Sequence, residues 1–223
     1  MPVAQFIDHT ILKNTTTIAE IEKICSEAME YSFAAVCVPP YYVRDAREIL
    51  GDSPIPVATV IGFPFGYSHY RSKVVESEMA LMEGARELDM VMNLAAFKSN
   101  DLAYLETEIN EVLKTALDKQ AKVKVIIESG ILNKEEIIKC CDLYRHFPIH
   151  YMKTSTGYAE KGATIEAVKT LRKHLPDHIG IKASGGIKTY EFARELVQAG
   201  ATRLGCSASI AIVKGEKAIS DSY

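Results

Sequence analysis

The feature that most constrains this chain is the regular alternation of short apolar runs with longer stretches of helical period. Apolar runs rich in β-branched residues are typical of buried strands. Alternation of strands with helices favours parallel strands joined by right-handed crossovers. The pattern therefore predicts an α/β protein, an eight-stranded parallel (β/α)₈ barrel of the TIM type. The predicted strands are Phe6–Ile7, Ala34–Val38, Val57–Ile61, Leu88–Met92, Val123–Ile127, His150–Met152, Ile179–Ile181 and Thr202–Leu204.

Helix start and stop signals support this alternation. Thr17 with Glu20, and Asn133 with Glu136, have the spacing of capping boxes ahead of amphipathic runs. The stretch 101–117 places six apolar residues on one stripe, as a helix packed on a core requires. Glycines at 84 and 200 follow helical runs and suit a left-handed helix end.

Length and composition fit one barrel. The chain has 223 residues, 48% of them hydrophobic, and no Pro/Ser-rich linker divides it. We therefore expect a single domain over residues 1–223, which is within the size range of such barrels. A doubly wound sheet is the alternative, but its first turn is usually glycine-rich. Here we expect the first turn to be Asp8-His9-Thr10, which contains no glycine.

Charge and cysteine usage exclude several classes of protein. The net charge is −3 and no basic stripe is present, so a nucleic-acid partner is not expected. No apolar run approaches the ~20 residues that span a bilayer, so we expect no membrane partner. The sequence has no zinc-type spacing of Cys and His, and we expect a cytoplasmic protein without metal or other cofactor. A homo-oligomer stays open. The five cysteines are Cys25, Cys37, Cys140, Cys141 and Cys206.

Two lysines stand at or near the carboxyl ends of neighbouring predicted strands. Lys153 and Lys182 are each followed by hydroxyl residues and glycine. Asp89 alternates with apolar residues in the fourth predicted strand, so it faces the opposite side from Leu88 and Met90. Barrel enzymes carry their chemistry at the carboxyl ends of the strands. If Asp89 faces the interior, a neighbouring lysine offsets the cost of burying its charge.

Paired lysines beside a carboxylate suit chemistry on a carbonyl group. A lysine amine attacks an aldehyde only when it is unprotonated, and a pKa of about 10.4 leaves little free amine at pH 7. Burial and a second ammonium group both lower the pKa of an amine. We therefore predict that Lys153 is the nucleophile, that Lys182 lowers its pKa, and that Asp89 moves protons through a water. The alternative, that both lysines are surface residues, requires the same pattern twice by chance.

Glycine-rich turns after the last three predicted strands indicate a phosphate site. Barrel phosphate sites are often built from the loops after strands seven and eight and the start of a short helix. We predict such a helix over residues 207–213. The alternative is that these glycines only form tight turns. The candidate substrate and phosphate ligands are Thr154, Gly157, Gly185, Gly186, Gly205 and Ser207.

Several segments together resemble the deoxyribose-phosphate aldolase family over nearly the whole chain. The most specific is Lys153-Thr-Ser-Thr-Gly157, which is similar to the segment that holds the imine-forming lysine of that family. Lys182-Ala-Ser-Gly-Gly-Ile187 resembles the segment with the second lysine, and Glu87-Leu-Asp-Met-Val-Met-Asn93 the strand with the catalytic aspartate. The other matches are 7–13, 35–39 and 60–66.

This resemblance implies a class I aldolase on a TIM barrel that uses aldehyde and sugar-phosphate substrates. The implied reaction is reversible cleavage of 2-deoxy-D-ribose 5-phosphate to acetaldehyde and D-glyceraldehyde 3-phosphate, with an imine on Lys153 as the electron sink. The chain departs from the family at Ser209, where a glycine is expected. If the φ angle there is positive, its Cβ restricts the backbone. Cys37 could line the pocket, and the terminal Tyr223 could fold over the mouth to transfer a proton.

Two other functions stay open. Another Schiff-base aldolase or a transaldolase would use the same lysines but take a longer, ketose-derived donor, and the sequence does not give the pocket volume. A non-catalytic sugar-phosphate-binding barrel would need the glycine turns but would have no use for paired lysines.

Overall fold

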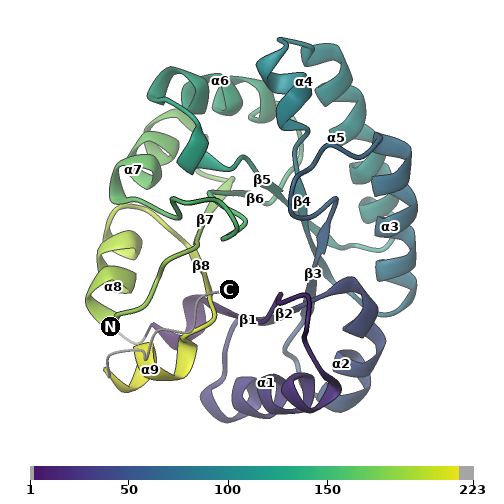
Figure 1. Ribbon diagram of the computed structural model, residues 1–223, viewed down its shortest axis with the longest axis vertical. Helices are drawn as coiled ribbons and strands as arrows, with labels where there is room; N and C mark the ends of the chain where they lie inside the picture. Colours follow the sequence, from purple (N-terminus) through teal and green to yellow (C-terminus); the bar gives the residue numbers. More distant parts are fainter. Residues whose placement is uncertain (1–2, 216–223) are drawn as a thin grey trace.

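The eight apolar runs form a closed barrel. The computed structural model describes residues 3–215, in which each strand pairs in parallel with the next and β1 pairs with β8 (Figure 1). The TIM-barrel prediction is confirmed. The strands are β1 Ile7–Thr10, β2 Ala35–Val38, β3 Val57–Ile61, β4 Glu87–Val91, β5 Lys122–Ile126, β6 Tyr151–Lys153, β7 Gly180–Ser184 and β8 Arg203–Cys206.

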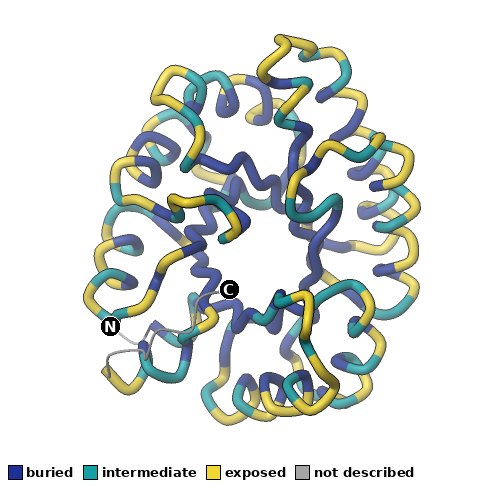
Figure 2. The backbone as a smooth tube through the Cα atoms, viewed as in Figure 1, coloured by how far each residue is buried: buried dark blue, intermediate teal, exposed yellow. Residues whose placement is uncertain are grey.

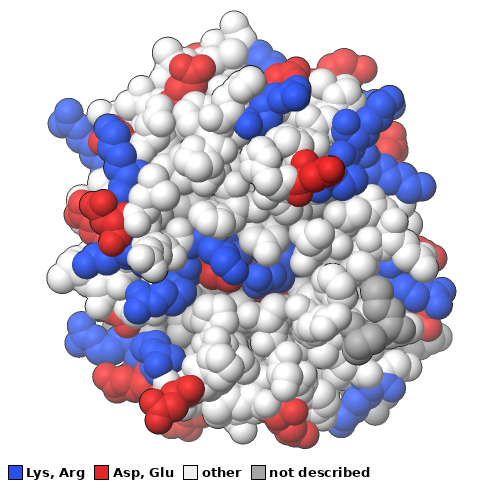
Figure 3. Space-filling model, turned by 180° about the vertical axis from the view of Figure 1, so that it is seen from behind, with Lys and Arg blue, Asp and Glu red and all other residues white. Residues whose placement is uncertain are grey.

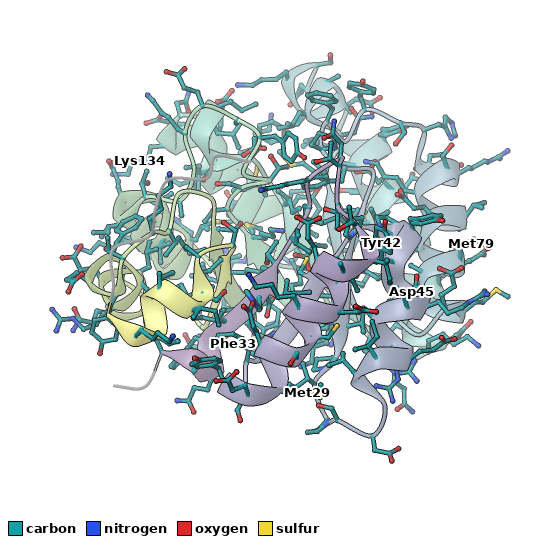
Figure 4. All side chains as sticks on the ribbon, turned by 60° about the horizontal axis from the view of Figure 1, so that its bottom comes forward. Met29, Phe33, Tyr42, Asp45, Met79 and Lys134 are labelled. Atoms are coloured by element: carbon teal, nitrogen blue, oxygen red, sulfur yellow. The ribbon has the colours of Figure 1, made fainter. Side chains whose placement is uncertain are left out.

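Helices surround the barrel and cover the outer face of the strands. Figure 2 shows the strand ring as buried, while the outward sides of the helices are exposed. Met29 of α1 and Met79 of α3 lie on these outer sides (Figure 4). The helices are α1 Ile18–Tyr31, α2 Val43–Leu50, α3 Tyr70–Met82, α4 Leu94–Lys98, α5 Leu102–Leu117, α6 Lys134–Tyr144, α7 Ile165–His174, α8 Tyr190–Gln198 and α9 Ser209–Lys214. Short 3-10 turns cover Ala4–Phe6, Pro40–Tyr42 and Ser129–Ile131.

The predicted helix caps are confirmed. Thr17 N–H donates to the Glu20 carboxylate at 2.8 Å, and Asn133 and Glu136 bond each other's backbone N–H groups at 2.9 Å. Gly84 and Gly200 have φ angles of 110° and 118°, in the region that glycine tolerates. No helix among residues 3–215 combines the length and the apolar character that a bilayer crossing needs.

Four of the predicted strands end too early: β1, β6, β7 and β8. Asp8-His9-Thr10 lies in β1 and is not a turn, because its first residue points into the barrel and pairs with Lys182 and Arg203. Strands β6, β7 and β8 also run one to three residues further than predicted, and β7 reaches Ser184. Polar residues in the interior of this barrel therefore made the ends of its strands look like loops.

Candidate active site

Lys153 is the last residue of β6, at the mouth of the barrel. Its side chain is almost fully buried, with 3% of its surface exposed, and its ammonium group lies 2.8 Å from Asp89 Oδ2. The backbone is fixed from the neighbouring strand, because Ile127 N–H donates to the Lys153 carbonyl at 3.1 Å. The nitrogen is therefore held inside the barrel by the β-ladder on one side and by a carboxylate on the other.

Lys182 stands directly beside Lys153. The two residues are register partners on β6 and β7, so their side chains leave the sheet on the same face. Lys182 Nζ lies 2.6 Å from Asp89 Oδ2, the same oxygen that Lys153 contacts. Asp89 is fully buried in β4. The three residues singled out from the sequence therefore meet at one carboxylate oxygen.

The surroundings of the two lysines shift their proton affinities in opposite directions. Burial lowers the pKa of Lys153, Asp89 opposes this, and the Lys182 ammonium lowers it further, which leaves the pKa below that of an ordinary lysine. Burial acts on Lys182 as well, but Asp8 and Asp89 outweigh it and raise its pKa to about 12. Of the two amines, Lys153 is the one that loses its proton first.

A larger set of buried charges supports this pair. Lys124 of β5 lies 2.6 Å from Asp89 Oδ1 and 2.7 Å from Glu87 Oε2. Arg203 of β8 lies 2.6 Å from Asp8 Oδ1 and 3.2 Å from Glu87. Burial works against the charge of Asp89, but the three lysines hold its pKa well below its usual range. We call these groups the interior charge network: Asp8, Glu87, Asp89, Lys124, Lys153, Lys182 and Arg203.

Sequence reasoning missed four members of this network. Lys124 alternates with Val123 and Val125, which is the same pattern that drew attention to Asp89. That signal could have found it. Asp8 and Glu87 lie just outside the predicted strands, so their inward orientation could not be read from alternation. Arg203 lies inside a predicted strand, but that strand of three residues is too short to show which side faces inward.

A cavity of about 360 Å³ opens beside the network at the ends of β6, β7 and β8. Lys188 and Tyr158 line it but were not predicted, although a cation two residues after a Gly-Gly pair is a usable signal for an anion site. Gly185 and Gly186 have φ angles of 85° and 74°, a backbone that other residues rarely adopt. The structure brings five predicted ligands together here: Gly157, Gly185, Gly186, Gly205 and Ser207.

Thr154 lies outside this cavity. It is fully buried, and its hydroxyl oxygen accepts a hydrogen bond from Ser184 N–H at 3.1 Å. The Thr154 backbone N–H donates to the Lys182 carbonyl at 2.9 Å. Thr154 thus joins β6 to β7 at the level of the two lysines.

The end of β8 differs from the prediction in two ways. Helix α9 begins at Ser209 and not at residue 207, because β8 extends to Cys206 and a turn follows it. Ser209 is helical, so it does not have the positive φ angle at which its Cβ would restrict the backbone. Its hydroxyl donates to the Cys206 carbonyl at 2.9 Å, a hydrogen bond that a glycine could not make.

Cys37 forms part of an apolar wall at the mouth. It is fully buried with Leu12, Ala58 and Val60, and Phe63 packs against the group. Burial raises the pKa of the Cys37 thiol, so it is a poor nucleophile near neutral pH. All five cysteines are buried and unpaired.

Two further expectations concern the tail and metal ions. Tyr223 lies outside the described residues. Among residues 3–215, the His, Cys, Asp and Glu side chains form no group of three or more that could hold a metal ion.

The geometry defines the class of protein before any relative is considered. It is a parallel barrel with a buried lysine of lowered pKa at a strand end, a second lysine beside it and a glycine-lined cavity. This arrangement belongs to enzymes that attack carbonyl groups with an amine.

Comparisons with known proteins narrow this class. The model of the DeoC/LacD family aldolases matches residues 2–214. The deoxyribose-phosphate aldolase of Thermococcus gammatolerans is 47% identical over 97% of each chain, and that of Caldicellulosiruptor saccharolyticus is 46% identical over 95% of this chain and 96% of its own. The tetrameric deoxyribose phosphate aldolase structure from Aeropyrum pernix superposes with a TM-score of 0.87 at 31% identity, covering 95% of this chain and 89% of its own. The chain belongs to the DeoC/LacD aldolase family.

Proposed function

We propose that this aldolase reversibly cleaves 2-deoxy-D-ribose 5-phosphate to acetaldehyde and D-glyceraldehyde 3-phosphate through an imine on Lys153. The observation that carries the proposal is the single Asp89 oxygen shared by Lys153 at 2.8 Å and Lys182 at 2.6 Å. One carboxylate between two amines favours one proton-bearing lysine and one free amine. A protein that only binds sugar phosphates would have no use for that arrangement.

The first step needs the free amine of Lys153. Its nitrogen adds to the aldehyde carbon of the open-chain sugar, water leaves, and a protonated imine remains. The Asp89 carboxylate lies where this positive charge develops and stabilises it, while the ammonium group of Lys182 is balanced by Asp8 as well as by Asp89. The imine then serves as the acceptor for the electrons of the bond that breaks.

Bond cleavage follows from the imine. A base removes the proton of the hydroxyl at carbon 3, the bond between carbons 2 and 3 breaks, and its electron pair moves into the imine to give an enamine. Glyceraldehyde 3-phosphate leaves with a new aldehyde group. The enamine takes up a proton at carbon 2, and water hydrolyses the resulting imine to acetaldehyde and free Lys153. We assign the proton transfers to Asp89 acting through water, with Lys182 as its partner.

The phosphate group fits the cavity of about 360 Å³ beside the network. Lys188 supplies a cation, and the turn at Gly185 and Gly186 lets the backbone approach an anion closely. Gly205 leaves room for the side chains of the neighbouring strand, because a Cβ there would lie 2.9 Å from Ser184 Cβ and 3.1 Å from Lys182 Cε. We propose that Gly157 and Ser207 complete the site.

The wall around Cys37 favours acetaldehyde over a longer donor. Leu12, Val60 and Phe63 offer no polar side-chain group to the hydroxyls of a ketose-derived donor such as dihydroxyacetone. Desolvating those hydroxyls against apolar side chains is unfavourable. This observation supports the deoxyribose-phosphate reaction over that of a transaldolase.

We also propose the finer features of its setting. Aldehydes and sugar phosphates are its small-molecule partners, and a net charge of −3 without a basic stripe gives no basis for nucleic-acid binding. The tetrameric relative from Aeropyrum pernix supports a homo-oligomer. Five unpaired, buried cysteines support a reducing compartment, the cytoplasm.

The test compares three substrates on the purified protein, with acetaldehyde release followed by a coupled dehydrogenase assay. We expect cleavage of 2-deoxyribose 5-phosphate, with kcat/KM reduced by about 100-fold for 2-deoxyribose without its phosphate. We expect no cleavage of fructose 6-phosphate, measured as glyceraldehyde 3-phosphate release with an acceptor aldose phosphate present to take the three-carbon unit. Preferred cleavage of the ketose would indicate a transaldolase, and binding of sugar phosphate without any cleavage would indicate a binding barrel. The Lys153→Met variant is the matched control for background activity.

A further inference from the structure

The proposed reaction uses the mouth end of the interior charge network and gives no part to Glu87 and Arg203. Both lie near the amino end of the barrel, Glu87 as the first residue of β4 and Arg203 as the first residue of β8. Only 1% and 7% of their surfaces are exposed. Apolar side chains of similar volume often fill such positions at no cost in stability. Their charge therefore calls for a reason other than packing.

A short chain of contacts links these two residues to the nucleophile. Glu87 contacts Lys124 at 2.7 Å, Lys124 contacts Asp89 at 2.6 Å, and Asp89 contacts Lys153 at 2.8 Å. On the other side, Arg203 contacts Asp8 at 2.6 Å, and Asp8 pairs with Lys182. Both routes run entirely through buried side chains.

The charges of the network do not cancel. Among the described residues it holds four cationic side chains and three carboxylates, which leaves one positive charge in excess when all are ionised. The excess disappears when one lysine loses its proton. Lys153 lies at the end of the network with a single carboxylate contact, whereas Lys124 and Lys182 each contact two or more carboxylates. The count therefore selects Lys153 as the neutral amine.

We propose that Glu87 and Arg203 are opposing positioning residues that set, from the far end of the barrel, the fraction of Lys153 present as free amine. The inference rests on the proposed function and extends it, since it adds two residues that touch neither substrate nor the reacting atoms. Glu87 favours the ammonium form of Lys153, and Arg203 favours the amine form.

The groups that face Lys153 directly come from other strands than the amino-end pair, or from other positions along them. Asp89 approaches from β4, Lys182 from β7 and the neutral thiol of Cys37 from β2. Glu128, which follows β5, influences Lys153 more weakly, and its carboxylate accepts hydrogen bonds from Thr156. None of these groups belongs to the pair at the amino end, so changes in that pair leave the immediate surroundings of the amine intact.

The amino end of the barrel is also separate from the substrate cavity. Figure 3 shows acidic and basic side chains in the centre of this face. A different cavity, of about 450 Å³, opens here and is lined by Lys122 and Tyr151. Lys122 reaches Glu87 at 3.5 Å, and the Tyr151 hydroxyl accepts a hydrogen bond from Arg203 at 3.3 Å. Substitutions at this face therefore act on Lys153 through charge and not through substrate contacts.

The size of the effect follows from the spacing. A strand rises about 3.3 Å per residue, and three contacts separate Glu87 from the amine, so the two groups lie on the order of 10 Å apart. At that distance a unit charge in a protein interior shifts a proton equilibrium by about one pH unit. Removing the negative charge in Glu87→Gln destabilises the ammonium form and lowers the midpoint. Removing the positive charge in Arg203→Met raises it.

The experiment measures the pH at which Lys153 reacts at half its maximal rate. Each variant receives acetaldehyde and sodium cyanoborohydride for a short fixed time at a series of pH values, and mass spectrometry gives the ethyl adduct on the Lys153 peptide. We expect the midpoint of Glu87→Gln to fall by about one pH unit and that of Arg203→Met to rise by about one. Arg203→Lys keeps the charge and should leave the midpoint in place. The double variant Glu87→Gln/Arg203→Met removes one charge of each sign and should restore it.

The variant Glu111→Gln changes the net charge by the same amount as Glu87→Gln at a half-buried position of the helix layer and should have no effect. Equal midpoints in all variants, or shifts of both single variants in the same direction, would overturn the inference. If Arg203→Met does not fold, Glu87→Gln and the double variant still decide the result. A wild-type protein that forms no adduct on Lys153 would instead contradict the proposed function.

Discussion

Two regions of this molecule bury lysines beside carboxylates, and they serve different ends. One is the interior charge network. The other lies between α3, α5 and the end of β4, where Lys73 contacts Glu108 at 2.6 Å and donates to the Val91 carbonyl at 2.7 Å. Both side chains of that pair are fully buried. Burial lowers the pKa of Lys73, as it does that of Lys153, despite the nearby carboxylate.

A lowered pKa therefore does not identify a nucleophile. Among residues 3–215, Lys73 has one ion-pair partner, Glu108. Glu108 also accepts a hydrogen bond from Asn93 N–H at 3.1 Å, so the pair ties two helices to the end of β4. Lys153 shares its carboxylate oxygen with a second lysine and stands at a strand end beside a cavity. The comparison supports the proposal that Lys153, where positive charge is in excess, is the reactive amine, and that Lys73, in a matched pair of the helix layer, is structural.

The largest expected effect is on kcat, in which variants of Lys153 and Lys73 should differ. Lys153→Met should lower kcat by about 10⁴-fold or more, because no other side chain replaces the covalent imine. Lys73→Met should leave kcat within about twofold per folded molecule, since that residue contacts no substrate. Steady-state rates normalised to folded protein check both. Retention of activity in Lys153→Met would place the nucleophile elsewhere.

The second prediction concerns the free energy of unfolding and the buried pair of Lys73 and Glu108. Lys73→Met leaves the buried Glu108 carboxylate without its cation and should lower the free energy of unfolding by about 3–5 kcal/mol. Urea denaturation measures the loss. The double variant Lys73→Met/Glu108→Leu removes both charges and should recover most of it. A single variant as stable as the wild type would show that this pair does not hold the helix layer together.

A third prediction tests the role of Lys182. In Lys182→Met the second ammonium disappears, Asp89 acts on Lys153 with less compensation, and the pKa of Lys153 should rise. The free amine at neutral pH, and with it kcat, should fall by about 100-fold, with the acidic limb of the pH profile moved to higher pH. Lys182→Arg keeps the positive charge and should retain more activity. An unchanged pH profile in the methionine variant would contradict this role.

The smallest expected effect is on KM and concerns Lys188 in the proposed phosphate cavity. Lys188→Gln should raise KM for 2-deoxyribose 5-phosphate by about 10-fold and change kcat by less than about twofold, because the lost cation contacts a part of the substrate that does not react. The same variant should cleave 2-deoxyribose without its phosphate at the wild-type rate. A fall in kcat on both substrates would show that Lys188 acts at the reacting carbon.

The barrel and its central residues could be predicted from the sequence because the signals for them are local. Apolar runs and helix caps report local structure, and Asp89 stands out because it interrupts an apolar strand. The positions of Lys153 and Lys182 followed once the strands were in order. The family resemblance added the reaction, which periodicity alone does not give.

The missed residues have a physical explanation too. Asp8 points inward from a short strand, so the local pattern there looks like a loop, and the predicted strand around Arg203 is too short to show which side faces inward. Their burial is possible only because partners from strands far away in the chain neutralise them, as Asp8 and Arg203 do across 195 residues. Long-range pairing of this kind leaves no local trace. The same holds for Thr154, whose hydroxyl bonds to the neighbouring strand instead of to a ligand.

The most direct test of the account is to trap the imine. The protein is incubated with acetaldehyde and sodium borohydride, which reduces an imine to a stable ethyl-amine, and the adduct is located by peptide mass spectrometry. The account predicts one ethyl group, on Lys153, with none on Lys182 or Lys73 and none anywhere in Lys153→Met. An adduct on Lys182, equal labelling of many lysines, or no adduct at all would contradict it.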